Sequence, residues 1–336
     1  MNRELAHKVA DAVLYEGYML YPYRPTALKN RQRWTFGILY PPEYPEVRSG
    51  SERSQMHTEC LIEADSDASV GIEFRFLQLV SRQIDPPFEP SLDLEVSSRS
   101  AQESGESSDE GVERTVELEL ALNANHQPID FRFPASNHRH EPTDANAALS
   151  AQSSANELRG NISVTTELVR DDIWKLKIDV ANTSLLPTSS LDRNAALRQS
   201  LLSAHMILTA SGANFISLLD PPEPLQNAAA ACVNVGNFPV LVGSGGERDM
   251  LLCSPILLYD YPQIAPESAG DFYDATEMDE MLTLRVMTLT DQEKDEMRVA
   301  EDRVRNLLQR TEQSAREQLM RTHGTIRGLR QVEETK

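Results

Sequence analysis

The chain has 336 residues, 40% of them hydrophobic and 25% charged, and its formal net charge is −20 at pH 7. A chain of this length can bury a substantial core and is longer than a typical single domain, so we expect two lobes, or one body with insertions. Its negative charge repels nucleic-acid phosphates and anionic membrane surfaces, which excludes both as expected partners.

The cysteine pattern and the N-terminal residues indicate a reducing compartment. Cys60, Cys232 and Cys253 lie far apart and form no CxxC pair, so a zinc ribbon, an iron–sulfur cluster and a disulfide framework are not expected. The N-terminal residues carry interrupting charges and do not resemble a signal peptide. No run approaches the about 18 apolar residues of a spanning helix. We therefore expect a cytoplasmic protein with buried free thiols, no membrane span and no cofactor.

The chain opens with a short predicted helix and an aromatic segment. Residues 4–15 place apolar side chains on one side of a helix, and residues 15–45 interleave aromatic and basic side chains. Such a mixture is typical of a protein interface, of an anion or nucleic-acid site, or of a tyrosine-rich hairpin packed on the body. The partner-binding candidates in this segment are Tyr18, Tyr21, Tyr23, Arg24, Arg33 and Trp34.

The middle of the chain alternates apolar and polar residues. The alternating runs are residues 72–76, 116–122, 129–133 and 162–180. The last run is broken at Arg170-Asp171-Asp172 and is predicted to form one hairpin. A period of two with one polar face predicts half-buried antiparallel strands. The expected fold class is α+β, with an antiparallel β-sandwich-like body, a mixed C-terminal lobe and C-terminal helices.

Two polar segments interrupt this body. Residues 91–112 carry many serines and acids, and residues 135–157 are equally poor in apolar side chains. Neither segment can bury enough surface to offset the entropy of ordering, so both are predicted to be flexible insertions. His138 and His140 lie in the second one; on a strand they would share a face and could chelate a metal, whereas a mobile loop gives them no such role.

The pattern changes after residue 190. Leu197, Leu201, Ala204 and Leu208 are spaced as on one face of a helix over residues 194–210, which Asp192 would cap, and this helix would carry His205. Residues 243–246 (GSGG) read as a hairpin turn and not as a phosphate loop, because no Gly-Lys-Ser/Thr follows. Thr290 and Glu293 form a capping box that opens a C-terminal helix.

The predicted organisation follows from these patterns. The segments are residues 1–90 with the tyrosine-rich stretch and first strands, 91–112 as a disordered acidic insertion, 113–190 with the remaining strands (135–157 flexible), 191–290 as a mixed α/β lobe, and 291–327 as C-terminal helices.

The densest candidate chemistry lies in residues 254–290, where carboxylates gather. Asp271, Asp274 and Glu277 are the candidates for a cation site, although their spacing matches no EF-hand. Asp260, Glu267 and Asp271 are candidates for a partner-binding surface, and a solvated loop is the remaining alternative. A thiol–imidazole pair between His205 and Cys232 or Cys253 is a further possibility that sequence distance does not decide.

Several long motifs carry a family resemblance. The segments FISLLDPPE, NFPVLVG, RDMLLCSPILLYDYPQ and THGTIR, with LYPYRP and RWTFGILYP near the start, resemble an uncharacterised bacterial family encoded beside high-affinity uptake [NiFe]-hydrogenases of soil bacteria. The resemblance implies a non-enzymatic accessory or assembly protein whose partner is a hydrogenase subunit or maturation factor. The alternatives are a metal-dependent enzyme using the acidic cluster 260–280 and a structural subunit of a large complex.

Overall fold

The computed structural model divides into two compact units. It describes residues 2–15, 36–84, 107–124, 126–140, 151–187, 191–263, 286, 288–299 and 302–313. The first unit contains Met1–Leu14 and Trp34–Pro262, and the second contains Tyr15–Arg33 and Gln263–Lys336. None of the helices that the structure describes combines the length and apolar character that a membrane crossing requires.

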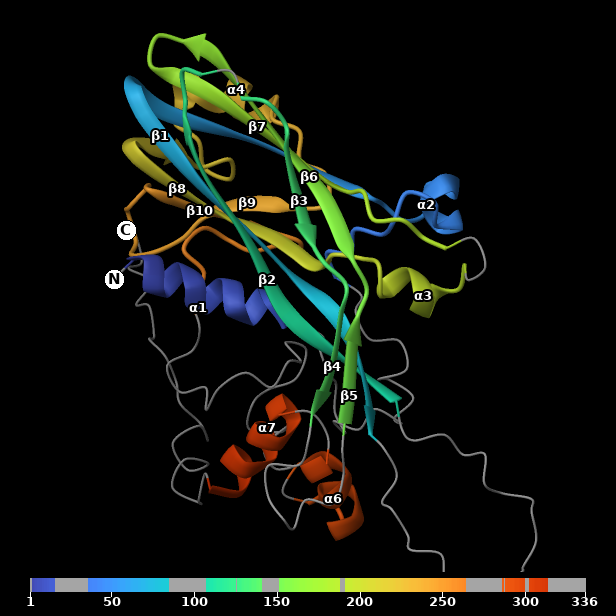
Figure 1. The fold of residues 1–336 in the computed structure, drawn as a ribbon. Helices are drawn as coiled ribbons and strands as arrows, with labels where there is room; N and C mark the ends of the chain where they lie inside the picture. The colour runs from blue at the N-terminus through green and yellow to red at the C-terminus, as the bar shows by residue number, and fades with distance from the viewer. Residues whose placement is uncertain are drawn as a thin grey trace, which may run out of the picture. The chain divides into compact units, whose positions relative to one another are not determined.

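Antiparallel strands dominate the first unit (Figure 1). Its elements are α1 (Asn2–Leu14), α2 (Pro45–Ser49), β1 (Gln55–Ile84), β2 (Ser107–Ala121), β3 (Ile129–Phe133), β4 (Ser136–His140), β5 (Ala151–Ala155), β6 (Leu158–Arg170), β7 (Ile173–Asn182), α3 (Arg193–Leu197), β8 (Leu202–Ile216), the 3-10 helix η2 (Glu223–Leu225), α4 (Gln226–Ala230), β9 (Phe238–Leu241) and β10 (Met250–Ser254). The second unit contains α6 (Asp291–Val299) and α7 (Asp302–Gln313).

The long strand β1 organises a single ten-stranded sheet. On one edge its residues 55–63 pair with β7 and residues 69–83 pair with β2; on the other edge residues 61–77 pair with β8 and residues 80–84 pair with β5. The path through the sheet is β3-β6-β7-β1-β8-β10-β9. Because β1 exchanges its neighbours midway, both halves of the sheet are tied to one strand.

The sheet curls into a half-barrel whose inner face holds the main core (Figure 1). Even-numbered residues of β1 supply much of this core, and the Phe74 ring meets the Phe131 ring of the non-adjacent strand β3 at 5.9 Å between centroids. Phe131 lies over Gly160 of β6, where an added Cβ would come within 2.1 Å of the ring. Glycine is therefore required at residue 160 so that the aromatic ring can cover the neighbouring strand.

The outer face is covered in two places. Helix α1 packs Ala6, Ala10 and Val13 on an apolar cluster contributed by β8, β9 and β10. The segment containing η2 and α4 covers the outer face near Leu61 and Ile216. Between these covers, no other described element lies over the outer face of β1, β2 and β8.

Several sequence predictions are confirmed. The chain is a β-rich α+β protein, the N-terminal helix forms, and β6 and β7 make the expected hairpin around Asp171, which has a positive φ of 37°. Residues 243–246 join β9 to β10 as a turn, and Asp192 caps α3 by accepting the N–H of Ala195 at 2.9 Å. The strands form one curled sheet, so the predicted two-layer sandwich is not confirmed.

The predicted helix over residues 194–210 is wrong beyond Leu197. From Leu202 onward this segment is the strand β8, including His205. Residues 202–208 are buried on both faces, inward in the main core and outward beneath α1, so the polar side chains of Ser203 and His205 do not mark a solvent-exposed face. A strand buried on both faces loses the period of two, and its leucine spacing then resembles that of a helix.

Three predicted boundaries also differ from the structure. Strand β2 begins at Ser107, inside the predicted insertion 91–112, and β4 and β5 lie inside the predicted flexible segment 135–157. Strands β2 and β5 pair with the end of β1, and β4 pairs with β5, so these polar strands have backbone partners. The mixed lobe predicted for residues 191–290 is not separate in its described part, since β8, β9 and β10 belong to the same sheet as β1.

In the second unit, the predicted capping box opens α6. The N–H of Glu293 donates to Thr290 Oγ1 at 3.3 Å, and the N–H of Thr290 donates to Glu293 Oε2 at 2.9 Å. The sequence predicts one helix from this point to about residue 311; its described residues are helical as α6 and α7, and residues 300 and 301 between them lie outside the described residues. Leu307 and Leu308 of α7 are buried.

Candidate functional site

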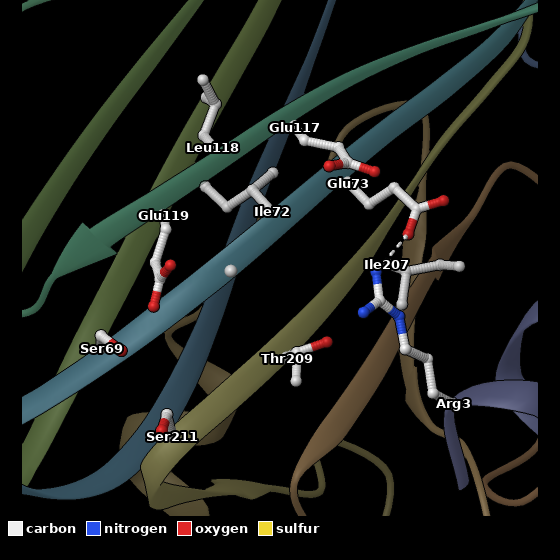
Figure 2. A pocket seen from close by; sticks show the side chains of 11 residues that line it. Arg3, Ser69, Ile72, Glu73, Glu117, Leu118, Glu119, Ile207, Thr209 and Ser211 are labelled. Atoms are coloured by element: carbon white, nitrogen blue, oxygen red, sulfur yellow. Dashed lines mark ion pairs between the residues drawn. The ribbon is translucent and has the colours of Figure 1, made fainter. Parts of the chain in front are cut away.

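An open trough of about 450 Å³ lies on the outer face of the sheet, where β2, β1 and β8 run side by side (Figure 2). Its lining forms three rows, one along each strand. The rows are Glu117 and Glu119 on β2, Ser69, Gly71 and Glu73 on β1, and Ile207, Thr209 and Ser211 on β8. Small and hydroxylated residues therefore form the floor, and carboxylates line the β2 side.

Gly71 keeps the centre of the trough open. It pairs with Glu119 on one side and Thr209 on the other, and it is not among the glycines with positive φ. A Cβ added here would meet its nearest neighbour, the Thr209 carbonyl oxygen, at 3.8 Å, which is an ordinary contact. The described structure thus gives no backbone or packing reason for glycine. A glycine inside a strand weakens the strand and often marks the close approach of a ligand or another chain.

The carboxylates make the trough acidic. Glu73 stands directly opposite Glu117 across the β1–β2 pair, and like charges in this position destabilise a sheet. Glu73 is partly neutralised by Arg3 of α1 at 3.8 Å and by Arg75 of its own strand at 3.7 Å, and His7 Nε2 of α1 lies 3.3 Å from its carboxylate. Glu117 and Glu119 are exposed, and no cation of the described residues pairs with either. Among the described residues, these two carboxylates are therefore available to a positively charged group.

One wall of the trough is anchored by Arg75. Its side chain is only 7% exposed, and its Nη2 lies 2.6 Å from Asp11 Oδ1 of α1 and 3.6 Å from Glu113 Oε2 of β2. Figure 2 shows Arg3 extending from the same helix toward Glu73. Because α1 is held by both apolar packing and these ion pairs, the trough wall is fixed relative to its floor.

His205 lies across the strand pair from Arg75 and is fully buried. Burial lowers its pKa to about 4, so the ring is neutral at pH 7. Its Nδ1 donates to the Ser203 carbonyl oxygen at 2.8 Å, and its Nε2 has no hydrogen-bond partner among the described residues. This histidine is buried on the outer face of the sheet, where α1 packs, and cannot meet a partner in the trough.

The predicted thiol–imidazole pair does not form. Cys253 belongs to the inner core, whereas the odd-numbered residues of β8 around His205 face outward. Burial raises the pKa of Cys253 to about 12 and also raises the pKa of Cys232, which is half-buried. Within the described residues, no three His, Cys, Asp or Glu side chains are placed to hold a metal ion.

A second charged cluster lies on the outer face near the start of β1. Glu59 is buried and meets Lys175 at 3.5 Å and Lys177 at 4.0 Å, and it accepts the N–H of Val233 at 2.9 Å. Burial acts to raise the pKa of Glu59, but these donors lower it overall. Lysines of the cluster balance the charge of Glu59, and its hydrogen bond to Val233 holds the loop before β9 against β1.

Of the sequence-predicted site residues, Asp260 is described and has a structural role. Its Oδ1 accepts the N–H of Leu241 at 2.8 Å, and its Oδ2 accepts the hydroxyl of Ser217 at 2.5 Å. The other predictions lie outside the described residues and stay predictions: Tyr18, Tyr21, Tyr23, Arg24, Arg33, Trp34, Glu267, Asp271, Asp274 and Glu277. His138 lies on the exposed strand β4.

Sequence reasoning missed the trough because its rows come from distant parts of the chain. Two signals could have indicated it. Gly71 interrupts an otherwise regular alternating strand, and Glu117 and Glu119 repeat a carboxylate on the polar side of another. Only the register of β1 with β2 and β8 shows that these signals meet.

The resemblance of the chain to known proteins is slight. No protein-family model matches it, and no curated protein matches it. Among solved structures, the InvG secretin domain beta-barrel from the Salmonella SPI-1 injectisome NC-base is 12% identical, covers 55% of this chain and 71% of that chain, and has a TM-score of 0.09. At that TM-score the likeness carries no argument about fold or function.

Proposed function

We propose that this chain is a non-enzymatic accessory protein that docks a partner protein through the acidic trough on β1, β2 and β8. The observation that carries the proposal is the open floor at Gly71 beside the exposed carboxylates of Glu117 and Glu119, which pair with no cation in the described part of the chain. An open, acidic, hydroxyl-lined surface suits a basic protein segment, because complementary charge steers association and fixes orientation.

The proposed partner is a [NiFe]-hydrogenase subunit or maturation factor in the cytoplasm. This part of the proposal is supported by the resemblance of the sequence motifs to the hydrogenase-associated family. The trough supports only the chemistry of the contact: the partner segment is basic, and it reaches the trough from solvent. Assembly or maturation of the hydrogenase is the process in which such a contact would act.

A pull-down with matched charge variants tests the proposal. The full chain, expressed in a host that carries the hydrogenase gene cluster, is expected to recover a hydrogenase component. Reversing two trough charges by Glu117→Lys with Glu119→Lys should abolish recovery. The control variant, Glu223→Lys with Glu247→Lys, changes the net charge equally at exposed residues elsewhere and should retain recovery. Gly71→Val should reduce recovery by filling the floor without altering charge.

Each part of the proposal fails on a different result. Unchanged recovery by the trough variant would show that the partner binds elsewhere. Recovery of no hydrogenase component by the unmodified chain, together with normal hydrogenase abundance and activity after deletion of the gene, would refute the accessory role.

A further inference from the structure

From Thr115 to Glu119, the second edge of β2 has backbone groups without a partner among the described residues. In the described part of the chain β2 pairs with β1 alone. Leu122 N–H donates to the Ala68 carbonyl at 3.0 Å, so even-numbered residues of this strand direct their backbone groups toward β1. Alternation along an antiparallel ladder then directs the N–H and C=O groups of Thr115, Glu117 and Glu119 away from β1. Consistent with this, the Ala121 carbonyl accepts the ring N–H of His126 at 2.8 Å on that side.

The two faces of this edge differ in chemistry. On the inner face Val116, Leu118 and Leu120 are only half-buried, although the β1 residues beside them are almost completely buried. On the outer face Glu117 and Glu119 border the acidic trough. An added strand would therefore meet apolar side chains on one face and carboxylates on the other.

The opposite end of the sheet is blocked against strand addition. Pro239 of β9 has no N–H to offer. At Leu241, the N–H donates to Asp260 Oδ1 and the carbonyl accepts the N–H of Tyr261 at 2.7 Å. Proteins commonly protect exposed edges in this way, so residues 115–119 of β2, which no described residue covers, contrast with β9.

We propose that the partner supplies an extended segment that adds to β2 as an antiparallel strand, with Lys or Arg alternating with apolar residues. The basic side chains lie on the outer face beside Glu117 and Glu119, and the apolar side chains cover Val116, Leu118 and Leu120 on the inner face. A second copy of β2 would instead place carboxylates opposite carboxylates, which is destabilising. This inference rests on the proposed function, because it specifies how the trough receives its partner.

A synthetic peptide tests the backbone geometry directly. The probe is a nine-residue peptide of alternating Lys and Val with blocked termini, titrated into the full chain by calorimetry. Residues opposite Glu117 and Glu119 in an antiparallel pair direct their amides at β2, and these are the lysines. N-methylation of the lysine amides should weaken binding at least about tenfold, whereas N-methylation of the valine amides should change it less than about threefold. A peptide of the same composition with all lysines first should also bind at least about tenfold more weakly.

Variants of the chain distinguish the contribution of backbone hydrogen bonds to peptide binding from the contribution of charge. Thr115→Pro removes an outward N–H without changing charge and should weaken the alternating peptide about five- to tenfold, while Thr115→Val should not. Glu117→Gln with Glu119→Gln should weaken the peptide and reduce the salt dependence of its binding. Proline at an outward-facing edge position leaves the β1–β2 hydrogen bonds intact.

The outcomes distinguish the two proposals. If both methylated peptides bind equally, the added strand is wrong; the trough proposal still stands if the Glu117→Lys and Glu119→Lys chain loses the hydrogenase component. If the chain alone forms a dimer in sedimentation that Thr115→Pro abolishes, β2 pairs with its own copy, and the basic-strand inference is overturned. Loss of binding only on methylation of the lysine amides supports the added strand.

Discussion

Acidification should destabilise the first unit through His205, and the size of the effect follows from its burial. The ring is fully buried, and its pKa falls to about 4 from an ordinary 6.5. Because the folded-state pKa lies below the unfolded one, the unfolded chain binds the proton first. The contribution of the neutral ring is therefore complete above about pH 6.5 and is lost as the pH falls toward 4.

The magnitude can be worked from these two values. Linkage gives a loss of about 1.3 kcal/mol between about pH 7.5 and about pH 5.5, and of about 2 kcal/mol by about pH 5. The assay is urea denaturation followed by circular dichroism across this range, for the unmodified chain and for His205→Leu, which cannot titrate. The difference in free energy of unfolding between the two should shift in favour of the variant by these amounts. If both chains lose stability in parallel, His205 is not held neutral by burial.

Three further substitutions test the packing. Gly160→Ala should lower the free energy of unfolding by about 1–3 kcal/mol, because the added carbon overlaps the ring of Phe131. The control is Gly245→Ala, in which no atom lies within 4 Å of the added carbon, and its urea midpoint should stay near that of the unmodified chain. Gly71→Val should raise the free energy of unfolding by about 0.5–1 kcal/mol, because the strand gains a β-branched residue with no clash; a lower midpoint would show that the floor is packed. Asp260→Ala should cost about 1–3 kcal/mol by removing both of its hydrogen bonds, and an unchanged thermal midpoint would refute that role.

Local patterns allowed part of the fold to be predicted from the sequence. The β6–β7 hairpin has one polar face and a turn at Asp171, and the capping box at Thr290 is complete within four residues. Each of these elements can be predicted from the residues that form it. Residues 202–208 of β8 cannot, because α1 and the inner core bury both of their faces, and their pattern then depends on tertiary structure.

The candidate site was less accessible to prediction for the same reason. The sequence directs attention to the carboxylates after residue 260, where composition is most unusual. Asp260 itself is used to close the β9 edge, while the exposed carboxylates Glu117 and Glu119 lie on a strand whose polar face looks ordinary. Their significance depends on Gly71 and Thr209 lying beside them, and register across distant strands is not encoded locally.

The long strand β1 has a consequence for synthesis of the protein on the ribosome. β1 ends at Ile84, but β8, which covers most of one of its edges, begins at Leu202. At about 5–20 residues per second, that edge waits roughly 6–24 s for its partner after β1 has been translated. During this interval a long apolar strand is open to pairing with other nascent chains. We therefore expect slow translation or a shortage of chaperones to lower the yield of folded protein more than a surface mutation would.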